Sequence, residues 1–252
     1  MKAILTSSLG GSIKVDGKRV PSVLLEENNL LKTLREIWTD NAKVMLVCAS
    51  PDDYEKNDSV CACMREAFPM SGLSISYLEK CDDRNEELVE RSGEMDVIIL
   101  GGGHVPTQNR FFKKIGLQER LRDFHGLLIA WSAGTMNCAV TVYAAPELEG
   151  EAADPHFERW ITGLGITDIN VFPHYQSLKD EYLDGLRVVE DITYKDSFGH
   201  GILALNDGSW LMIEDGREIL HGEAYLIQDG TLKQICRNGE SVVLNVKSGA
   251  ET

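Results

Sequence analysis

Short apolar runs alternate with longer amphipathic stretches through the first two thirds of the chain, and this rhythm limits the fold more than any other feature. Four of the runs are rich in Val, Ile and Leu and show little polar alternation, as is typical of parallel strands covered on both faces. They are KVMLVCAS (43–50), LSISYL (73–78), MDVIIL (95–100) and LLIAW (127–131). The stretches between them place apolar residues at helical spacing, so the sequence predicts repeated β-α-β units.

Helices are expected at 59–68, 84–93 and 108–124, with Gly116 interrupting the last of them. The fold class predicted is therefore α/β, with a doubly wound, mostly parallel sheet flanked by helices. The chain has 252 residues, of which 43% are hydrophobic and 26% are charged. These values fit a soluble globular protein, and we expect one domain spanning 1–252.

The pattern changes after about residue 200. Five short apolar segments follow one another, and NDG, EDG and DG separate them as turns. They predict an antiparallel meander over about 200–236 that extends or flanks the sheet. The stretch 144–160 is expected to be a long surface loop; the alternative is that its acids, such as Glu147, gate a site or bind a substrate amine.

The formal net charge of -15 argues against binding to nucleic acid or to anionic membranes, because both depend on clustered Lys and Arg. The sequence has no apolar run of membrane-spanning length, and the apolar segment in its first 17 residues is too short to be expected to act as a signal peptide. A cytoplasmic location is therefore expected. The six cysteines follow no zinc-binding spacing and are expected to be buried, reduced thiols. We expect no metal and no cofactor.

The stretch AWSAG (130–134) places Ser132 between a buried strand and a segment able to form a helix. This arrangement is typical of a nucleophile elbow, in which small neighbours permit a tight turn and the serine stands clear of the sheet. Ala133 and Gly134 provide that smallness. The usual first glycine is replaced by Ala130, and the alternative interpretation is that Ser132 simply caps the helix.

A second motif, GGGH (101–104), follows the strand MDVIIL directly. Three glycines allow backbone N–H groups to approach a ligand closely, as an oxyanion hole requires; the alternative is a flexible turn. The spacing GxGxxG is absent, so a dinucleotide fingerprint is not indicated.

A serine nucleophile needs a base, usually a histidine that an acid holds in place. His174 lies just beyond an apolar run that begins near Ile166, at the edge where the side chains of an α/β site gather. Asp207 follows another apolar segment and is a candidate acid, although NDG is also a ready hairpin turn. Three further acids compete with it: Glu190, Asp191 and Asp196.

The motifs GGGHVPTQ, AWSAG, PHY and NDGSW together resemble the aspartyl dipeptidase (peptidase E) family, serine hydrolases related to cyanophycinase with a class I glutamine amidotransferase-like fold. The resemblance implies that Ser132 is the nucleophile, His174 the base and Asp207 the third member of the triad. It implies backbone oxyanion donors at Ala133 and at the glycine turn, Gly103 with Gly102 beside it.

The substrate implied is a short peptide, with dipeptides carrying Asp or a β-aspartyl linkage as one option. We expect contacts to it from His104, Tyr175 and Lys179. The family binds the substrate's aspartate carboxylate with an Arg downstream of the histidine, where this chain offers Lys179 or Arg187. Besides the peptide substrate, the partner left open is a second copy of the chain in a homodimer.

Two other functions remain as alternatives. The first is a non-catalytic protein that binds a small molecule or peptide on the same fold. The second is an amidotransferase-like amidase, against which stand Ser132 in the place of a cysteine and Gln176 in the place of a glutamate.

Overall fold

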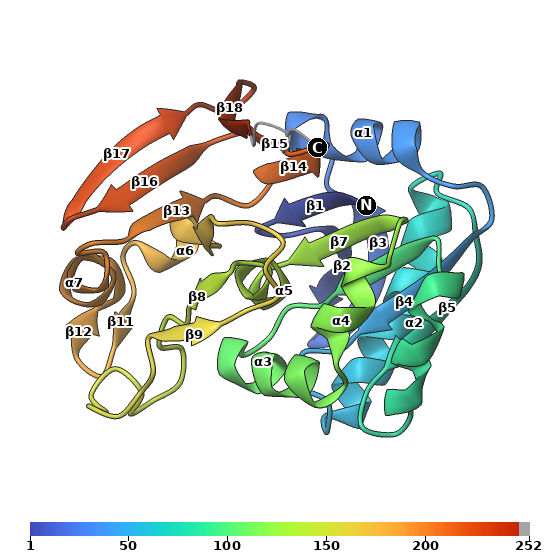
Figure 1. Cartoon of the computed structure of the whole chain (residues 1–252), viewed down its shortest axis with the longest axis horizontal. Coiled ribbons are helices and arrows are strands. Elements are labelled where there is room, and N and C mark those ends of the chain that lie inside the picture. The colour runs from blue at the N-terminus through green and yellow to red at the C-terminus, as the bar shows by residue number, and fades with distance from the viewer. Residues whose placement is uncertain (247–252) are drawn as a thin grey trace, which may run out of the picture.

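The computed structural model describes residues 1–246, and within them the largest element is an eight-stranded sheet with the order β18-β15-β14-β1-β7-β6-β4-β5 (Figure 1). From β1 to β5 neighbouring strands run parallel, whereas β14, β15 and β18 continue the sheet in antiparallel fashion. The expected α/β fold with a mostly parallel sheet is confirmed. The strands are β1 (Lys2–Thr6), β4 (Ala42–Val47), β5 (Ile75–Cys81), β6 (Val97–Leu100), β7 (Leu127–Trp131), β14 (Trp210–Glu214), β15 (Arg217–His221) and β18 (Ser241–Val246).

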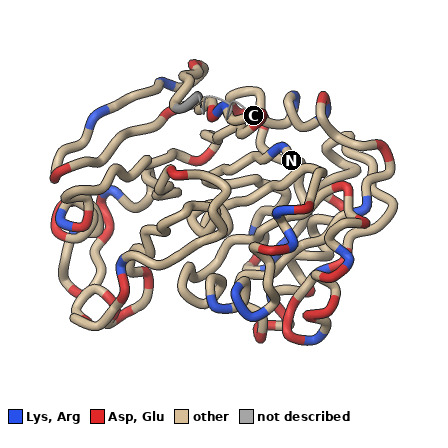
Figure 2. Tube along the Cα trace, in the orientation of Figure 1, with Lys and Arg blue, Asp and Glu red and all other residues tan. Residues whose placement is uncertain are grey.

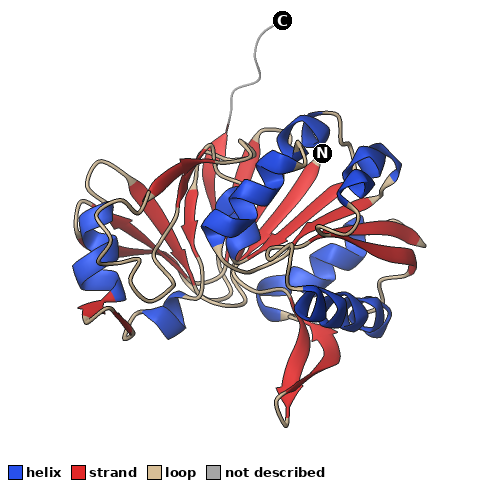
Figure 3. Ribbon diagram, turned by 90° about the horizontal axis from the view of Figure 1, so that it is seen from below, coloured by secondary structure: helices blue, strands red, loops and turns tan. Residues whose placement is uncertain are grey.

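Helices cover both faces of this sheet (Figure 3). Successive strand residues point to opposite faces, and in β7 Leu127 and Ile129 join the core under α1 and α2, whereas Leu128 and Ala130 join the core under α3 and α4. This double burial explains why the strands read as continuous apolar runs. The helices of the two layers are α1 (Leu30–Ile37), α2 (Tyr54–Met70), α3 (Val105–Lys114) and α4 (Leu117–Arg122). Figure 2 shows the charged residues mostly on the outer helices and turns.

Local sequence signals set the limits of several helices. The Asp53 side chain accepts a hydrogen bond from the backbone N–H of Lys56 and caps α2. Gly116 adopts a φ of 63° and separates α3 from α4, as expected. The segment expected as a helix at 84–93 is a 3₁₀ helix, η2 (Glu86–Glu94). Two other short segments are η1 (Glu27–Asn29) and the π-helix η3 (Val188–Thr193).

The antiparallel strands expected after residue 200 are present, and they are divided between two sheets. β14 and β15 belong to the main sheet, whereas β13, β16 and β17 form a four-stranded sheet in which β13 also pairs in parallel with β10. The chain therefore crosses between sheets at the turn around Asp207. The second sheet consists of β10 (Asn170–Phe172), β13 (Gly201–Leu205), β16 (Ala224–Gln228) and β17 (Thr231–Cys236).

Three two-stranded ribbons complete the description. The ribbon β2–β3 projects from the body of the molecule (Figure 3). The ribbons are β2 (Gly10–Val15) with β3 (Lys18–Leu24), β8 (Thr141–Tyr143) with β9 (Trp160–Thr162), and β11 (Tyr182–Leu183) with β12 (Leu186–Arg187). The remaining helices are short: α5 (Ala133–Asn137), α6 (Tyr175–Leu178) and α7 (Tyr194–Asp196). Residues 144–159 form the expected long loop between β8 and β9.

All six cysteines are buried and free, as expected for reduced thiols. Within residues 1–246, no helix has both the length and the apolar character needed to cross a membrane. The single-domain organisation over 1–252 stays a prediction. The glycine turn, Ser132 and the residues that follow β1 and β4 all lie beyond the carboxyl ends of the parallel strands, which is where ligands bind in open α/β sheets.

Candidate active site

Ser132 stands at a sharp turn between β7 and α5. Its φ of 52° and ψ of −122° lie in a region that side chains rarely adopt, and such strain typically costs about 1–3 kcal/mol. The backbone N–H of Ser132 is held between the carbonyl oxygens of Thr6 at 3.1 Å and Ser7 at 3.2 Å. The Thr135 hydroxyl donates to the same Thr6 oxygen at 2.8 Å. The end of β1 thus fixes the conformation of the elbow.

The small residues of the elbow are required by close packing against the glycine turn. A Cβ atom on Gly134 would lie 2.3 Å from the carbonyl oxygen of Leu100. A Cβ atom on Gly102 would lie 2.9 Å from the Cβ of Ser132 and 2.8 Å from the ring of Trp131. The elbow and the GGG turn are therefore in direct contact. Ala130 replaces the usual first glycine without difficulty, because its side chain is fully buried in the core.

The expected oxyanion donors are the backbone N–H groups of Gly102, which contacts Ser132, of Gly103, which follows it in the glycine turn, and of Ala133, which follows Ser132 in the chain. In the described part of the chain, the N–H groups of Gly102, Gly103 and Ala133 have no hydrogen-bond partner, whereas the N–H of Gly101 is used by the carbonyl of Val47. Their role stays a prediction, and their N–H groups are free for it.

His174 and Asp207 meet across the ends of two strands. His174 follows β10 with a φ of 58°, and its Nδ1 lies 2.8 Å from Oδ1 of Asp207, which occupies the turn between β13 and β14. Burial disfavours the charge on Asp207, but hydrogen bonds from His174 and Ser7 outweigh it and lower the pKa of this carboxyl. An ionised carboxylate only accepts hydrogen bonds, so Nδ1 carries the proton, and Nε2 is an acceptor in the neutral form of the imidazole.

Ser7 joins these two residues and was not singled out from the sequence. Its hydroxyl donates to Oδ1 of Asp207 at 2.6 Å and accepts the backbone N–H of His174 at 2.8 Å. The Gln176 side chain accepts the backbone N–H of Asp207 at 2.9 Å. The sequence feature that could have indicated Ser7 is its position, because it is a polar residue directly after a buried strand, at the edge of the sheet where the site forms.

Two of the three competing acids have other partners. Asp191 makes a two-pronged ion pair with Arg187, and Asp196 accepts a hydrogen bond from the hydroxyl of Tyr143 at 2.8 Å. Among the acids considered from the sequence, Asp207 is the one that the described structure places at His174.

Ser132 and His174 line the same cavity, whose volume is about 450 Å³. Its other walls come from the 144–159 loop, including Pro146 and Glu147, and from apolar residues such as Leu178 and Val188. Within the described residues, the Ser132 hydroxyl makes no hydrogen bond to His174. The two side chains thus share a cavity without a hydrogen bond between them in the described structure.

Glu147 brings an acid into this cavity. Burial of its carboxyl and the nearby Glu151 carboxylate raise the pKa of Glu147 to about 7, although the residue keeps contact with solvent and the charges of His174 and Lys56 oppose the shift. The cavity wall therefore contains a carboxyl group that changes charge near neutral pH.

The three residues expected to contact substrate have different surroundings. His104 is occupied on both ring nitrogens, by Thr107 at 2.8 Å and by Glu151 at 2.9 Å, and so ties the loop to the glycine turn. Tyr175 is buried against Tyr225. Lys179 is exposed at the end of α6, and none of the three lines the cavity. Their role in substrate binding stays a prediction.

No metal site is indicated by the described side chains, since they form no group of three or more His, Cys, Asp or Glu positioned around an ion. The cavity that Ser132 lines also contains the imidazole of His174, backed by the carboxylate of Asp207, and the carboxyl group of Glu147. Such a set can perform acyl transfer with proton shuttling.

A family model described as Peptidase family S51 matches residues 24–220, which is most of the chain. The chain belongs to this family. The match confirms the expected resemblance to peptidase E, and membership of S51 makes the protein a peptidase. Ser132, His174 and Asp207 lie inside the matched region, whereas Ser7 precedes it.

Solved structures support the S51 fold. A peptidase from an acI-B1 Actinobacterium superposes with a TM-score of 0.64 at 15% identity, covering 96% of each chain. A putative peptidase E protein from Listeria monocytogenes EGD-e gives a TM-score of 0.55 at 14% identity, covering 93% of this chain and 98% of that one. At these identities the likeness concerns the fold. Among curated proteins, no sequence matches this chain.

Proposed function

We propose that this protein is a serine peptidase that cleaves short peptides through an acyl-enzyme on Ser132. The observation that carries the proposal is the hydrogen bond between His174 and the ionised Asp207, made beside a serine held in a strained elbow. A serine hydroxyl is a weak nucleophile near neutral pH unless a positioned base removes its proton.

His174 is the proposed base. With the proton of Nδ1 directed to Asp207, Nε2 takes the proton of the Ser132 hydroxyl as the oxygen attacks the peptide carbonyl. His174 then gives this proton to the leaving amine, and water hydrolyses the acyl-enzyme by the same steps in reverse. Asp207 orients the imidazole and stabilises its charged form.

The charge that develops on the carbonyl oxygen is proposed to be stabilised by the N–H groups of Gly102, Gly103 and Ala133. Their freedom from other hydrogen bonds supports this role, since a preorganised donor does not have to break an existing bond during the reaction.

The proposed substrates are short peptides, with dipeptides carrying Asp or a β-aspartyl linkage as one option. The cavity of about 450 Å³ is closed on one side by the 144–159 loop, and a space of this size suits a small ligand better than a folded protein. The amidase alternative is weakened by Gln176, which uses its side-chain oxygen to hold the backbone of Asp207.

One observation favours a second candidate function, a non-catalytic peptide-binding protein. The Ser132 hydroxyl and His174 share a cavity but are not hydrogen-bonded to each other in the described structure. A catalytic pair often tightens only when substrate binds, so a chemical test is needed to separate the two candidates.

The test is labelling with a small fluorophosphonate, followed by mass spectrometry to locate the adduct. We expect the adduct on Ser132 in the unmodified protein and none in Ser132→Ala. His174→Ala should slow labelling by several orders of magnitude, because triad members act as a unit. Ser177→Ala is the matched control, since Ser177 lines the same cavity.

Folding is verified for each variant by circular dichroism. Labelling of Ser132 that persists without His174 would contradict the proposed base. A folded protein that takes no label at Ser132 would favour the binding function instead.

A further inference from the structure

The 144–159 loop, which forms one wall of the cavity, is attached to the glycine turn through the carboxylate of Glu151. Oε1 of Glu151 lies 2.9 Å from Nε2 of His104, the residue that follows the three glycines. Oε2 of the same side chain accepts the backbone N–H groups of Glu147 at 2.9 Å and of Leu148 at 3.0 Å. Glu151 therefore connects the part of the loop that lines the cavity to the turn where the oxyanion donors are expected.

His104 is itself held in place by α3. Its Nδ1 lies 2.8 Å from the hydroxyl of Thr107, and its carbonyl oxygen accepts the backbone N–H of Gln108 at 3.0 Å. The amide of Gln108 donates to the carbonyl of Gly101 at 2.6 Å, and its oxygen accepts a hydrogen bond of 3.0 Å from Asn137 at the end of α5. The buried side chains of Gln108 and Asn137 thus join the attachment point of the loop to the glycine turn and to the elbow helix.

The outer side of the loop has a separate anchor. Asp184, in the turn between β11 and β12, accepts the backbone N–H groups of Gly150 at 2.8 Å and of Ala152 at 3.0 Å. These bonds fix the loop to the β11–β12 ribbon, which is not part of the glycine turn. The contact between His104 and Glu151 is the polar contact that fixes the loop relative to the residue after this turn.

This contact is shielded from solvent. The side chains of His104 and Glu151 are 18% and 16% exposed, whereas those of His174 and Asp207 are 34% and 38% exposed. Interactions between charged groups weaken with exposure to water and salt. The bond from His104 to Glu151 is therefore expected to keep its strength at physiological ionic strength.

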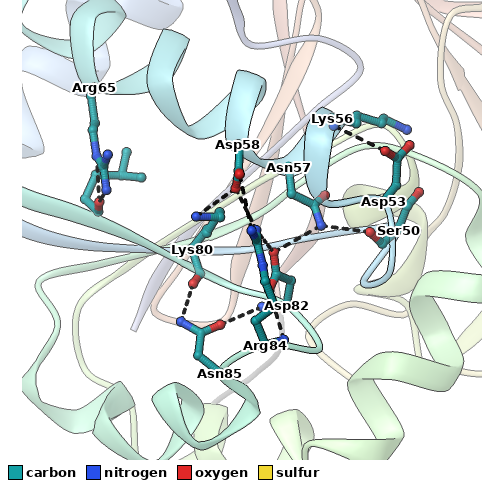
Figure 4. A network of polar contacts seen from close by, with 11 residues as sticks. Ser50, Asp53, Lys56, Asn57, Asp58, Arg65, Lys80, Asp82, Arg84 and Asn85 are labelled. Carbon is teal, nitrogen blue, oxygen red and sulfur yellow. Dashed lines mark hydrogen bonds and ion pairs between the residues drawn. The ribbon is translucent and has the colours of Figure 1, made fainter.

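The segment that Glu151 holds places Glu147 within electrostatic reach of the site. The charges of His174 and Lys56 act on the Glu147 carboxyl and oppose the rise of its pKa. Lys56 lies in the first turn of α2, where the neighbouring Asn57 side chain is hydrogen-bonded to the loop after β4 (Figure 4). Glu147 thus faces groups that are fixed by other elements, and its own position depends on the loop.

We propose that Glu151 is a positioning residue for the peptidase reaction, whose carboxylate holds the loop wall of the cavity at the distance from the oxyanion turn that a bound short peptide requires. The proposal rests on the proposed function, because it takes the reacting carbonyl to lie at the oxyanion turn and the rest of the peptide to lie against the loop. Glu151 does not line the cavity, so it acts through Glu147 and the backbone beside it.

The first experiment compares a peptide with a small reagent. Glu151→Ala should raise KM about 10-fold for whichever of Asp-Leu, Asn-Leu and Ala-Leu is cleaved fastest, and should change kcat less than about threefold, because binding of the peptide is lost rather than the chemical step. Fluorophosphonate labelling of Ser132 uses the oxyanion turn but not the loop, so its rate should also change less than about threefold. Asp154→Ala is the matched control and should leave KM unchanged, because Asp154 is an exposed carboxylate of the same loop that accepts the backbone N–H of His156.

Two further variants test the contact itself. Glu151→Gln should restore most of the binding, because its amide oxygen can accept the loop N–H groups while its NH₂ group donates to Nε2 of His104 in the other tautomer. His104→Ala combined with Glu151→Ala should raise KM no more than Glu151→Ala alone, since both changes remove the same contact. Losses that multiply, or a Gln variant as impaired as the Ala variant, would overturn the proposal.

Hydrogen exchange followed by mass spectrometry tests the loop without turnover. In the Ser132→Ala protein, Glu151→Ala should speed exchange of the backbone N–H groups of residues 145–152 about 10-fold, whereas Asp154→Ala should not. Unchanged exchange in β1 and β7 verifies that the sheet is intact. Faster exchange in the loop with an unchanged KM would leave Glu151 a purely structural role and overturn the proposal.

The same measurements separate this proposal from the proposed function. If exchange responds to Glu151→Ala while hydrolysis does not depend on Ser132, the proposed function fails and the attachment of the loop by Glu151 stands. If hydrolysis depends on Ser132 but neither KM nor exchange responds to Glu151→Ala, the positioning role alone is refuted.

Discussion

Replacing Asp207 with Asn tests how the imidazole of His174 is held. Both His174 Nδ1 and the Ser7 hydroxyl point to the same oxygen, Oδ1, at 2.8 and 2.6 Å. Because Ser7 already accepts the backbone N–H of His174, its own proton needs an acceptor at this position. An Asn side chain should therefore place its amide oxygen there and keep the proton on Nδ1. Asp207→Asn is expected to remove the charge and to preserve the tautomer.

The expected loss follows from the difference between a charged and a neutral hydrogen bond, about 1–2 kcal/mol, or about 5- to 30-fold in rate. The lower end is expected, since the side chains of His174 and Asp207 are 34% and 38% exposed and solvent screens their interaction. Without Ser7 the amide is free to turn its NH₂ group toward Nδ1 and reverse the tautomer. Asp207→Asn combined with Ser7→Ala should then lose about 10⁴-fold.

The assay is the second-order rate of fluorophosphonate labelling at Ser132, which requires no known substrate, measured for the two single variants and the double variant. Asp207→Asn and Ser7→Ala together are expected to slow labelling far more than the product of their separate effects. If Asp207→Asn alone loses as much as the double variant, Ser7 does not select the tautomer and the argument is refuted.

Three further predictions concern the surroundings of the site. Gly102→Ala should slow labelling about 100-fold and destabilise the protein by about 1–3 kcal/mol, because its Cβ would lie 2.9 Å from that of Ser132; Gly93→Ala, which meets no atom within 4 Å, should leave the labelling rate unchanged. Asp82→Asn should lower the free energy of unfolding in urea by about 2 kcal/mol, because the buried carboxylate loses its ion pair; an unchanged midpoint would show that the network in Figure 4 contributes nothing to stability. The pKa of Glu147 is about 7 in the folded protein and 4.5 in its ordinary state. Between these two pH values the folded state holds a proton that the unfolded state has released, so the free energy of unfolding falls as pH rises through that range. Glu147→Gln should exceed the unmodified protein in stability by about 1 kcal/mol at pH 8 after solvent screening and match it near pH 5; parallel curves at both pH values would contradict this.

Much of the fold could be predicted because buried parallel strands leave a strong sequence signal. The runs ending at Leu100 and Trp131 are strands, and Gly116 divides two helices as its backbone freedom indicates. The partition of the C-terminal strands between two sheets was not predicted, since short strands joined by NDG and EDG turns look alike whichever sheet they join. β13 joins the second sheet by pairing with β10, and β14 joins the main sheet by pairing with β1. Both partners are distant in sequence, so no local pattern shows which sheet each strand joins.

The site shows the same division between local and distant information. The strained turn at Ser132 is encoded by its small neighbours, and the position of His174 follows from the strand before it. Ser7 was missed because its role depends on residues 167 and 200 positions away.

The anchoring of the elbow to the end of β1 has a consequence for the order in which the protein becomes competent during synthesis. Ser132 leaves the ribosome long before Asp207. The strand β1, which Ser7 follows directly, gains its neighbour β14 only after Asp207 has been synthesised. If Asp207 orients His174 as proposed, the Ser132 hydroxyl of the nascent chain has no oriented base until more than four fifths of the protein has been translated. Activity then cannot precede the synthesis of the turn between β13 and β14, and a translation product that ends before this turn would carry the nucleophile without the acid that orients its base.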